Sequence, residues 1–295
     1  MIMKNYIVVT GGAGFVGSNL IGHFLKKTKY KIISVDNYSS GLKKNHIKSN
    51  RITYIKGDTK NILQLLNSKK KNINAIFHFG EFARIYQSFL KMDQCLESNS
   101  VGTHAVFNFC LKYNIKLIYS ATSATLGNKG KDENLSPYAF TKAKNLELLE
   151  NLKKWFKMKY EVIYFYNVYG PNQICEGDMA TVIGIFEDCF KKKKALPIVK
   201  PGTQSRKFTH ITDTVNVCFE AWKKNKCRHY SISSKKNFTI LELAKMFESK
   251  IKFLPPRKGE RYASALASLN LSNKVFKKFG NTSLEKYIQV FIKKN

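Results

Sequence analysis

The first half of the chain alternates short apolar runs with longer amphipathic stretches. The apolar runs are rich in β-branched and aromatic residues, which predicts buried strands at 6–10, 31–35, 52–55, 75–79, 117–120 and 162–166. Helical spacing predicts helices at 15–26, 62–66, around 89–113 and at 137–156. Because strands and helices alternate, we expect an α/β fold with a doubly wound parallel sheet.

The alternation becomes irregular after about residue 170. Helical spacing at 181–192 and 240–247 flanks a short apolar run at 195–199, and prolines and glycines cluster between them. We therefore expect residues 1–170 to form the main sheet domain. Residues 171–295 are expected to form mainly a smaller C-terminal α/β lobe, with 208–233 returning to the sheet.

Charge and cysteine content narrow the function classes. The formal net charge is +31, which favours anionic partners, but the basic runs are scattered and lysine is frequent in every segment. We attribute the charge to a lysine-rich composition and predict neither a nucleic-acid surface nor a membrane partner. The six cysteines form no CxxC pair, and the chain starts directly with a strand, so we expect free thiols, no signal peptide and a cytoplasmic location.

A glycine-rich turn joins the first predicted strand to the first predicted helix. The segment 10–17 reads TGGAGFVG, with Gly11, Gly14 and Gly17 three residues apart. Glycines let the backbone turn sharply and approach a pyrophosphate, and the helix N-terminus supplies N–H donors and a positive dipole end. Since the turn lies between a strand and a helix, it predicts a Rossmann-type dinucleotide site.

Two acidic residues follow the next predicted strands. Asp36 ends the second strand, where a carboxylate accepts hydrogen bonds from ribose hydroxyls and repels a 2′-phosphate. No arginine follows immediately, so NAD is favoured over NADP as the cofactor. Asp58 is placed either to contact the adenine or to cap the following helix, and the two roles are compatible.

A tyrosine and a lysine share one face of the helix predicted at 137–156. Tyr138 and Lys142 are four residues apart in SPYAFTKAK. An ammonium near a phenol lowers the pKa of that phenol, and the phenolate can then take a hydroxyl proton while hydride leaves for NAD. An exposed helix pair is the alternative, but the glycine turn upstream favours the chemical role.

These motifs together resemble the extended short-chain dehydrogenases/reductases. The resemblance rests on TGGAGFVG, Asp36, Asp58 after Gly57, Asn99 in NSVGT, the Ser/Thr run before Gly127, and Tyr138 with Lys142. YFYNVYGP at 164–171, RKFTHITD at 206–213 and RKGER at 257–261 are similar to the nucleotide-sugar epimerase/dehydratase branch, most of all to its UDP-glucose 4-epimerase members. The resemblance covers nearly the whole chain.

The resemblance implies roles for individual residues. It implies that Thr122 binds the reacting sugar oxygen and acts with Tyr138 and Lys142, and that Ser123 can substitute for it; a strand-end turn with local hydroxyl bonds is the alternative. Further substrate contacts are implied at Asn167, Arg206 and Arg257. Two guanidinium groups suit the oxygens of a diphosphate, and the alternative is that both arginines are only surface charges. The implied cofactor contacts, besides those above, are Phe15, Val16, Asn37, Phe79, Gly80 and Asn99.

The segment 78–84, HFGEFAR, departs from the family forms. Ala83 stands where the 4-epimerases carry a cofactor-binding lysine, and Glu81 and Arg84 are unusual there. Contact with the cofactor, with each other or with the sugar remains open for these two residues. Thr122 is followed by Ser123 and Ala124, where dehydratases and decarboxylases carry an acid that moves a second proton.

We therefore predict an NAD-dependent nucleotide-sugar epimerase that inverts C4 of a UDP-hexose through a 4-keto intermediate. The alternatives are an NAD-dependent dehydrogenase or dehydratase for nucleotide sugars and, more remotely, a non-catalytic nucleotide- or RNA-binding protein. No metal is expected, since the six histidines have no metal-ligand spacing. The resemblance also implies a homodimer formed through the helices at 103–113 and 138–156, and a setting in cell-envelope or capsule polysaccharide synthesis.

Overall fold

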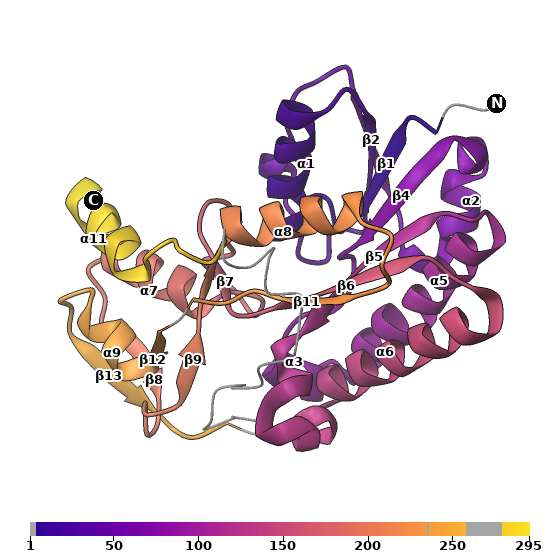
Figure 1. Cartoon of the computed structure of the whole chain (residues 1–295). Helices are drawn as coiled ribbons and strands as arrows, with labels where there is room; N and C mark the ends of the chain where they lie inside the picture. The colour runs from indigo at the N-terminus through magenta and orange to yellow at the C-terminus, as the bar shows by residue number, and fades with distance from the viewer. Residues whose placement is uncertain (1–3, 235, 258–278) are drawn as a thin grey trace.

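A seven-stranded parallel sheet forms the centre of the molecule (Figure 1). The computed structural model describes residues 4–234, 236–257 and 279–295, and only the backbone at 127–131. The strand order is β11-β6-β5-β4-β1-β2-β3, so the doubly wound parallel sheet is confirmed. The strands are β1 (Tyr6–Thr10), β2 (Lys31–Asp36), β3 (Ile52–Lys56), β4 (Ile73–His78), β5 (Lys116–Thr122), β6 (Tyr160–Phe165) and β11 (His229–Ser231).

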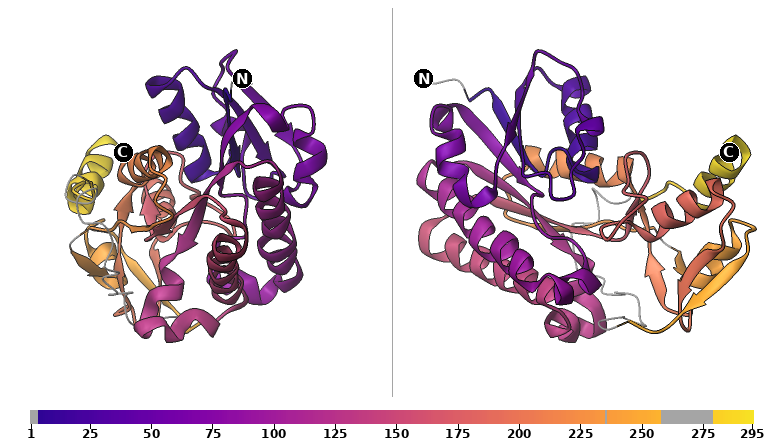
Figure 2. Two further views of the ribbon diagram at one scale, coloured as in Figure 1. Left: turned by 45° about the vertical axis from the view of Figure 1, so that its right-hand side comes forward. Right: turned by 180° about the vertical axis from the view of Figure 1, so that it is seen from behind.

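Helices cover both faces of this sheet (Figure 2). On one face α1 (Phe15–Lys27) and α8 (Ile211–Lys223) pack through Phe24 and Val217 onto the strands. On the other face lie α2 (Ile62–Leu66), α5 (Thr103–Lys112) and α6 (Pro137–Phe156). The chain order of the strands reverses between β1 and β4, and ligands of open α/β sheets bind at the carboxyl ends of strands beside such a reversal.

The helical stretch predicted around 89–113 is broken into four pieces. These are α3 (Ile85–Leu90), α4 (Met92–Leu96), the π-helix η4 (Glu97–Gly102) and α5. Gly102 ends η4 and lies against the 3₁₀ helix η2 (Thr59–Asn61), where a Cβ would lie 2.2 Å from Thr59 Oγ1. The wider π turn carries Asn99, which is fully buried.

The C-terminal lobe surrounds its own apolar core. Phe186, Leu196 and Phe247 are completely buried in it. Its helices are α7 (Val182–Lys191), α9 (Ile240–Lys245) and α11 (Leu284–Lys294), and its strand pairs are β12 (Asn237–Thr239) with β9 (Ser205–Lys207) and β13 (Ile251–Leu254) with β8 (Leu196–Val199).

Two connections tie this lobe to the sheet domain. β7 (Val168–Tyr169) pairs with β10 (Thr209–His210) as the chain passes between the two parts. α8 and β11 then return to the main sheet, where β11 pairs in parallel with β6. The short 3₁₀ helices are η1 (Lys43–Asn45), η3 (Lys70–Asn72) and η5 (Ser123–Asn134). No helix in the described part of the chain is both long and apolar enough to cross a bilayer.

Candidate active site

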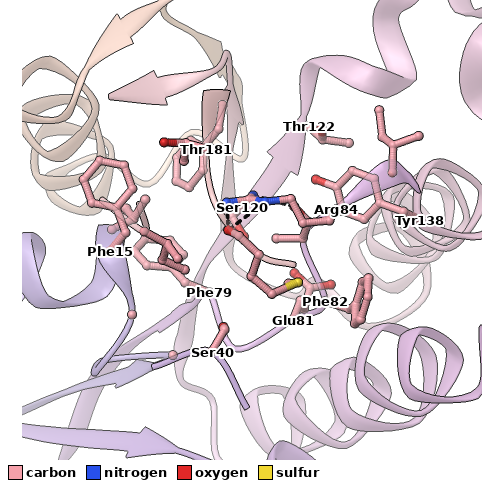
Figure 3. Close-up of a pocket in the computed structure, with 18 of the residues that line it drawn as sticks. Phe15, Ser40, Phe79, Glu81, Phe82, Arg84, Ser120, Thr122, Tyr138 and Thr181 are labelled. Atoms are coloured by element: carbon pink, nitrogen blue, oxygen red, sulfur yellow. Dashed lines mark hydrogen bonds between the residues drawn. The ribbon is translucent and has the colours of Figure 1, made fainter. Parts of the chain in front are cut away.

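A cavity of about 800 Å³ lies at the carboxyl ends of the parallel strands (Figure 3). Its lining comes from the sheet domain and from the C-terminal lobe. Every residue that the sequence predicts for catalysis, cofactor or substrate lines this cavity, except Asn99. The fold thus brings together side chains that are widely separated along the chain.

The glycine turn forms the end of the cavity near β1. Gly11 has a φ of +69°, and a Cβ there would lie 2.8 Å from the backbone of Phe79. A Cβ on Gly17 would lie 2.2 Å from the Gly11 carbonyl oxygen. Gly14 is the N-cap of α1 and provides no side-chain cap, while Phe15 and Val16 line the cavity. This is the backbone arrangement that a pyrophosphate requires.

Asp36 and Asp58 lie beside this turn. The carboxylate of Asp36 accepts hydrogen bonds from the backbone N–H groups of Ala13 (2.9 Å) and Tyr38 (2.8 Å). Burial raises the pKa of Asp36, while those bonds lower it. Asp58 accepts a bond from Asn37 Nδ2 at 2.7 Å and makes no side-chain capping bond to the helix that follows. Both acids line the cavity, and their contact with an adenosine stays a prediction.

Asn99 supports the cavity wall from behind. Its amide makes two bonds with the backbone of Phe82, accepting at 2.6 Å and donating at 3.1 Å. His78 lies nearby at the end of β4, between Thr10 Oγ1 (2.7 Å) and Thr103 Oγ1 (3.0 Å). Burial lowers the pKa of His78 to about 4, so the ring is neutral near pH 7. A direct cofactor contact of Asn99 stays a prediction.

The start of α6 presents Tyr138 to the cavity. Ser136 caps this helix by accepting a bond from Ala139 N at 3.1 Å, and Pro137 occupies its first turn. The backbone N–H of Tyr138 donates to Ser88 Oγ at 3.3 Å, which joins α6 to α3. Opposite, Thr122 ends β5 and its hydroxyl accepts a bond from Ala124 N at 3.1 Å. The local capping bond exists, and Thr122 still lines the cavity.

Lys142 forms a buried ion pair with Glu81, which the sequence did not predict. The ammonium donates to Glu81 Oε2 and to the Ser120 carbonyl, and the two charged side chains are only 4% and 2% exposed. Glu81 Oε1 accepts bonds from Thr103 Oγ1 and Tyr119 OH, both at 3.0 Å. Burial lowers the pKa of Lys142 and the Glu81 charge raises it. The only sequence signal was an acid directly after a buried strand.

Arg84, the residue before α3, is held by carbonyl oxygens. Its Nε donates to the Met179 carbonyl at 3.0 Å, a second nitrogen donates to the same oxygen, and Nη1 donates to the Ala83 carbonyl at 2.7 Å. Figure 3 shows the side chain extending into the cavity beside Tyr138. Burial lowers the pKa of Arg84, and the Tyr138 phenol raises it.

The predicted substrate residues come from the segment after β6 and from the C-terminal lobe. Asn167 donates to the Lys207 carbonyl at 2.8 Å, and Arg206 on β9 donates to the Ser205 carbonyl at 2.9 Å. The Arg257 guanidinium lies 5.5 Å from the Tyr86 ring centroid. All three line the cavity. The rest of the RKGER motif, at 258–261, is outside the described residues.

The profile of the NAD dependent epimerase/dehydratase family matches residues 7–233. The chain belongs to this family. Its cofactor is accordingly NAD, and the glycine turn and the acid at the end of β2 fit that group. The described residues contain no cluster of His, Cys, Asp or Glu that could hold a metal ion.

Relatives within the NAD-dependent epimerase/dehydratase family are named for different activities. The chain is 32% identical over 230 residues to a Bacillus subtilis protein named "Uncharacterized UDP-glucose epimerase YtcB". The match covers 71% of this chain and 70% of that protein. It is 29% identical over 256 residues to dTDP-D-glucose 4,6-dehydratase of Bos taurus, covering 81% and 71% respectively. The names of the relatives thus include both epimerases and dehydratases.

One solved structure matches almost end to end. UDP-glucose 4-epimerase from Thermotoga maritima, crystallised with UDP-glucose, superimposes with a TM-score of 0.87 over 98% of this chain and 97% of its own. The sequence identity is 24%. The likeness therefore shows a shared fold that includes the C-terminal lobe.

Proposed function

We propose that this chain is an NAD-dependent nucleotide-sugar 4-epimerase that acts on a UDP-hexose through a 4-keto intermediate. The observation that supports it best is the composition of the cavity near Tyr138. Thr122, Tyr138 and Lys142 line one cavity, and no acid available for a second proton transfer accompanies them among the described lining residues.

The acids that do line the cavity are each held by other groups. Asp36 and Asp58 lie at the glycine-turn end, and Glu97 is paired with Lys60 at 2.6 Å. Glu81 is sealed in its ion pair with Lys142. Since removal of water from a sugar requires an acid beside the catalytic hydroxyl, and Ser123 and Ala124 stand there, epimerisation is favoured over dehydration.

The residues of the chain divide the work of this reaction. Tyr138 takes the proton of the sugar C4 hydroxyl, and Thr122 holds that oxygen through its own hydroxyl. NAD would be held by the glycine turn and Asp36 and, when bound, would supply the hydride acceptor and donor for C4. Arg206 and Arg257 hold the diphosphate while the 4-keto sugar rotates to present its other face to the hydride donor. Tyr138 then gives the proton back.

The names of the similar proteins support this choice of substrate class. The Bacillus subtilis relative is named as a UDP-glucose epimerase, and the Thermotoga maritima structure contains UDP-glucose. We carry the UDP-hexose class over to this chain as part of the proposal.

A panel of sugar nucleotides tests the proposed reaction. Purified protein with NAD is incubated with UDP-glucose, UDP-galactose, their N-acetyl and uronic forms, and GDP-, ADP- and dTDP-linked hexoses, and the products are resolved by NMR. We expect one UDP-sugar to be converted into its C4 epimer without net NADH. A 4-keto-6-deoxy product, or a keto sugar formed with stoichiometric NADH, would replace epimerisation by dehydration or oxidation.

Tyr138→Phe tests the assigned proton acceptor. Because the variant lacks the phenolic oxygen that takes the proton, we expect kcat to fall by about 10²–10⁴-fold while NAD still binds. Turnover is measured on the converted substrate and NAD binding by calorimetry. Tyr113→Phe, at the end of α5 and outside the cavity lining, is the matched control and should keep its activity. Retained activity in Tyr138→Phe would contradict the mechanism.

A further inference from the structure

The charge balance around Tyr138 differs from the arrangement that the motif itself suggests. A lysine four residues after the tyrosine is expected to lower the pKa of the phenol through its positive charge. Here that ammonium is already matched by a carboxylate in direct contact with it. Because the carboxylate is in contact with the ammonium, it offsets much of the positive field that Lys142 exerts on neighbouring groups.

The Lys142–Glu81 pair is also fixed in place. Besides the ion pair, Lys142 donates to the Ser120 carbonyl and lies 4.7 Å from the centre of the Tyr119 ring. Asn145 links the network to the Asn99 carbonyl at 2.7 Å and to Tyr119 OH at 3.1 Å. The pair is therefore an ordered unit without net charge, and the Lys142 ammonium has a fixed position within it.

Arg84 carries a charge that its neighbours do not cancel. Three of its nitrogens donate to the Met179 and Ala83 carbonyls, which are neutral acceptors. These bonds orient the guanidinium and leave its positive charge intact. The side chain is half-buried and interacts electrostatically with Tyr138, and Figure 3 shows the two side chains at the same side of the cavity.

The other charged groups at this end of the cavity contribute less. Lys91 is paired with Asp178 at 2.9 Å on the rim, and both side chains are largely exposed. Arg257 is exposed beside Tyr86, so water and salt screen its charge. Burial raises the pKa of Tyr119 well above the usual value, so its phenol is neutral.

We propose that Arg84 supplies the unbalanced positive charge that the protein itself contributes to favour the Tyr138 phenolate, and that Glu81 offsets the charge of Lys142 and fixes its position. Arg84 and Glu81 are thus two positioning residues that act through Tyr138. The inference rests on the proposed role of Tyr138 as the proton acceptor. Its test measures the ionisation of that phenol and requires no sugar substrate.

The phenol can be titrated directly after 3-fluorotyrosine is incorporated in place of Tyr138. The ¹⁹F shift of the NAD-loaded protein is followed against pH in the otherwise unchanged chain and in Arg84→Gln. Removing a nearby positive charge disfavours the phenolate, so the midpoint should rise by about one pH unit. Arg84→Lys keeps the positive charge, so its midpoint should stay close to that of the unchanged protein. Arg84→Met replaces Arg84→Gln if the Gln variant does not fold.

Two further variants separate charge from structure. Lys144→Gln removes a positive charge from the exposed side of the same helix and should leave the midpoint in place, because solvent screens that site. Glu81→Gln should leave the midpoint unchanged if Lys142 then loses its proton, or lower it if Lys142 stays charged. In the epimerase assay, the acidic limb of the kcat profile should follow the ¹⁹F midpoints.

Two outcomes would overturn the proposal. An unchanged midpoint in both Arg84→Gln and Arg84→Met would show that Arg84 does not set the acidity of the Tyr138 phenol. A midpoint that rises in Glu81→Gln would mean that Lys142 is the acidifying cation and that Glu81 keeps it protonated. Neither result depends on which sugar is turned over, so failure of the epimerase assignment would be seen separately in the substrate panel.

Discussion

Single glycines decide how closely the cofactor turn can pack. Gly17 lies in the first turn of α1, where a Cβ would lie 2.2 Å from the Gly11 carbonyl and 2.8 Å from Gly12 Cα. Both neighbours are backbone atoms, which cannot move without opening the turn. Gly22 lies further along the same helix, and a Cβ there would meet only the Ile47 Cδ1 atom, at 3.3 Å.

Gly17→Ala and Gly22→Ala should therefore have opposite effects. Alanine is favoured over glycine within a helix by about 1 kcal/mol, so Gly22→Ala should raise the free energy of unfolding by up to that amount and keep NAD affinity. Gly17→Ala should lower it by about 1–3 kcal/mol through overpacking and weaken NAD binding at least about tenfold. Denaturant unfolding and calorimetry measure both. Parent-like NAD affinity in Gly17→Ala would argue against the turn as the pyrophosphate site.

At the scale of elements, His78 connects β4 to its neighbours. Its ring bonds Thr10 of β1 and Thr103 of α5 and is completely buried. Because its pKa is about 4 in the folded protein and 6.5 is the usual value, the unfolded chain binds a proton first as the pH falls. The stability contributed by the neutral ring is present above about pH 6.5 and is lost as the pH falls towards 4.

We expect this histidine to cost about 3 kcal/mol of unfolding free energy between pH 6.5 and 4. His78→Gln should reduce the slope of unfolding free energy against pH in that range by one proton, whatever its effect on the absolute stability. His104→Gln, on the exposed side of α5, should retain the full slope. Urea unfolding at a series of pH values gives both slopes, and equal slopes in the two variants would contradict the buried neutral ring.

The apolar pattern predicted most elements because it reports which side of each element is buried. The six strands expected in 6–166 are present to within a residue or two at each end. The pattern did not predict the break between α3 and α4, where Lys91 leaves the helical region with φ −128° and ψ 50°, because hydrophobic spacing does not report backbone angles. Small strand pairs such as β9 with β12 were missed because each strand is only three residues long.

The site was predicted to the extent that motifs determine it. The glycine turn, Asp36, Thr122 and Tyr138 line one cavity as expected, although their chemical roles stay predictions. The partner of Lys142 could not be predicted, because Glu81 lies 61 positions away and reaches it only through the fold. Hydrophobic periodicity carries no information about which polar group a neighbouring element supplies.

At the scale of the whole molecule, one face of the sheet domain exposes apolar side chains. Val101 on η4 is 56% exposed, Phe140 on α6 is 44% exposed, and Leu96 on α4 is partly exposed as well. These elements lie beside one another, next to α5. A second copy of the chain would cover such a face, in line with the homodimer that the family resemblance implies.

We expect the protein to sediment as a dimer, and Val101→Glu combined with Phe140→Glu to shift it to a monomer. In a dimer the two new carboxylates would be buried at the interface, which is costly. The substitutions should therefore favour the monomer. Val290→Glu, on α11 of the other lobe, is the control and should leave the dimer intact. Sedimentation velocity distinguishes the species, and a monomeric parent protein would exclude the dimer.

The anchoring of Arg84 on Met179 has a consequence for how the two parts of the molecule can vary. Arg84 belongs to the sheet domain, whereas Met179 lies in the segment between β7 and α7 that leads into the C-terminal lobe and lines the cavity. If Arg84 sets the acidity of the phenol, that acidity depends on a carbonyl from the segment that also shapes the room for the sugar. The choice of sugar and the proton affinity of the Tyr138 phenol would then change together. Substitutions that adapt this segment to another sugar would also shift the pH at which the enzyme works.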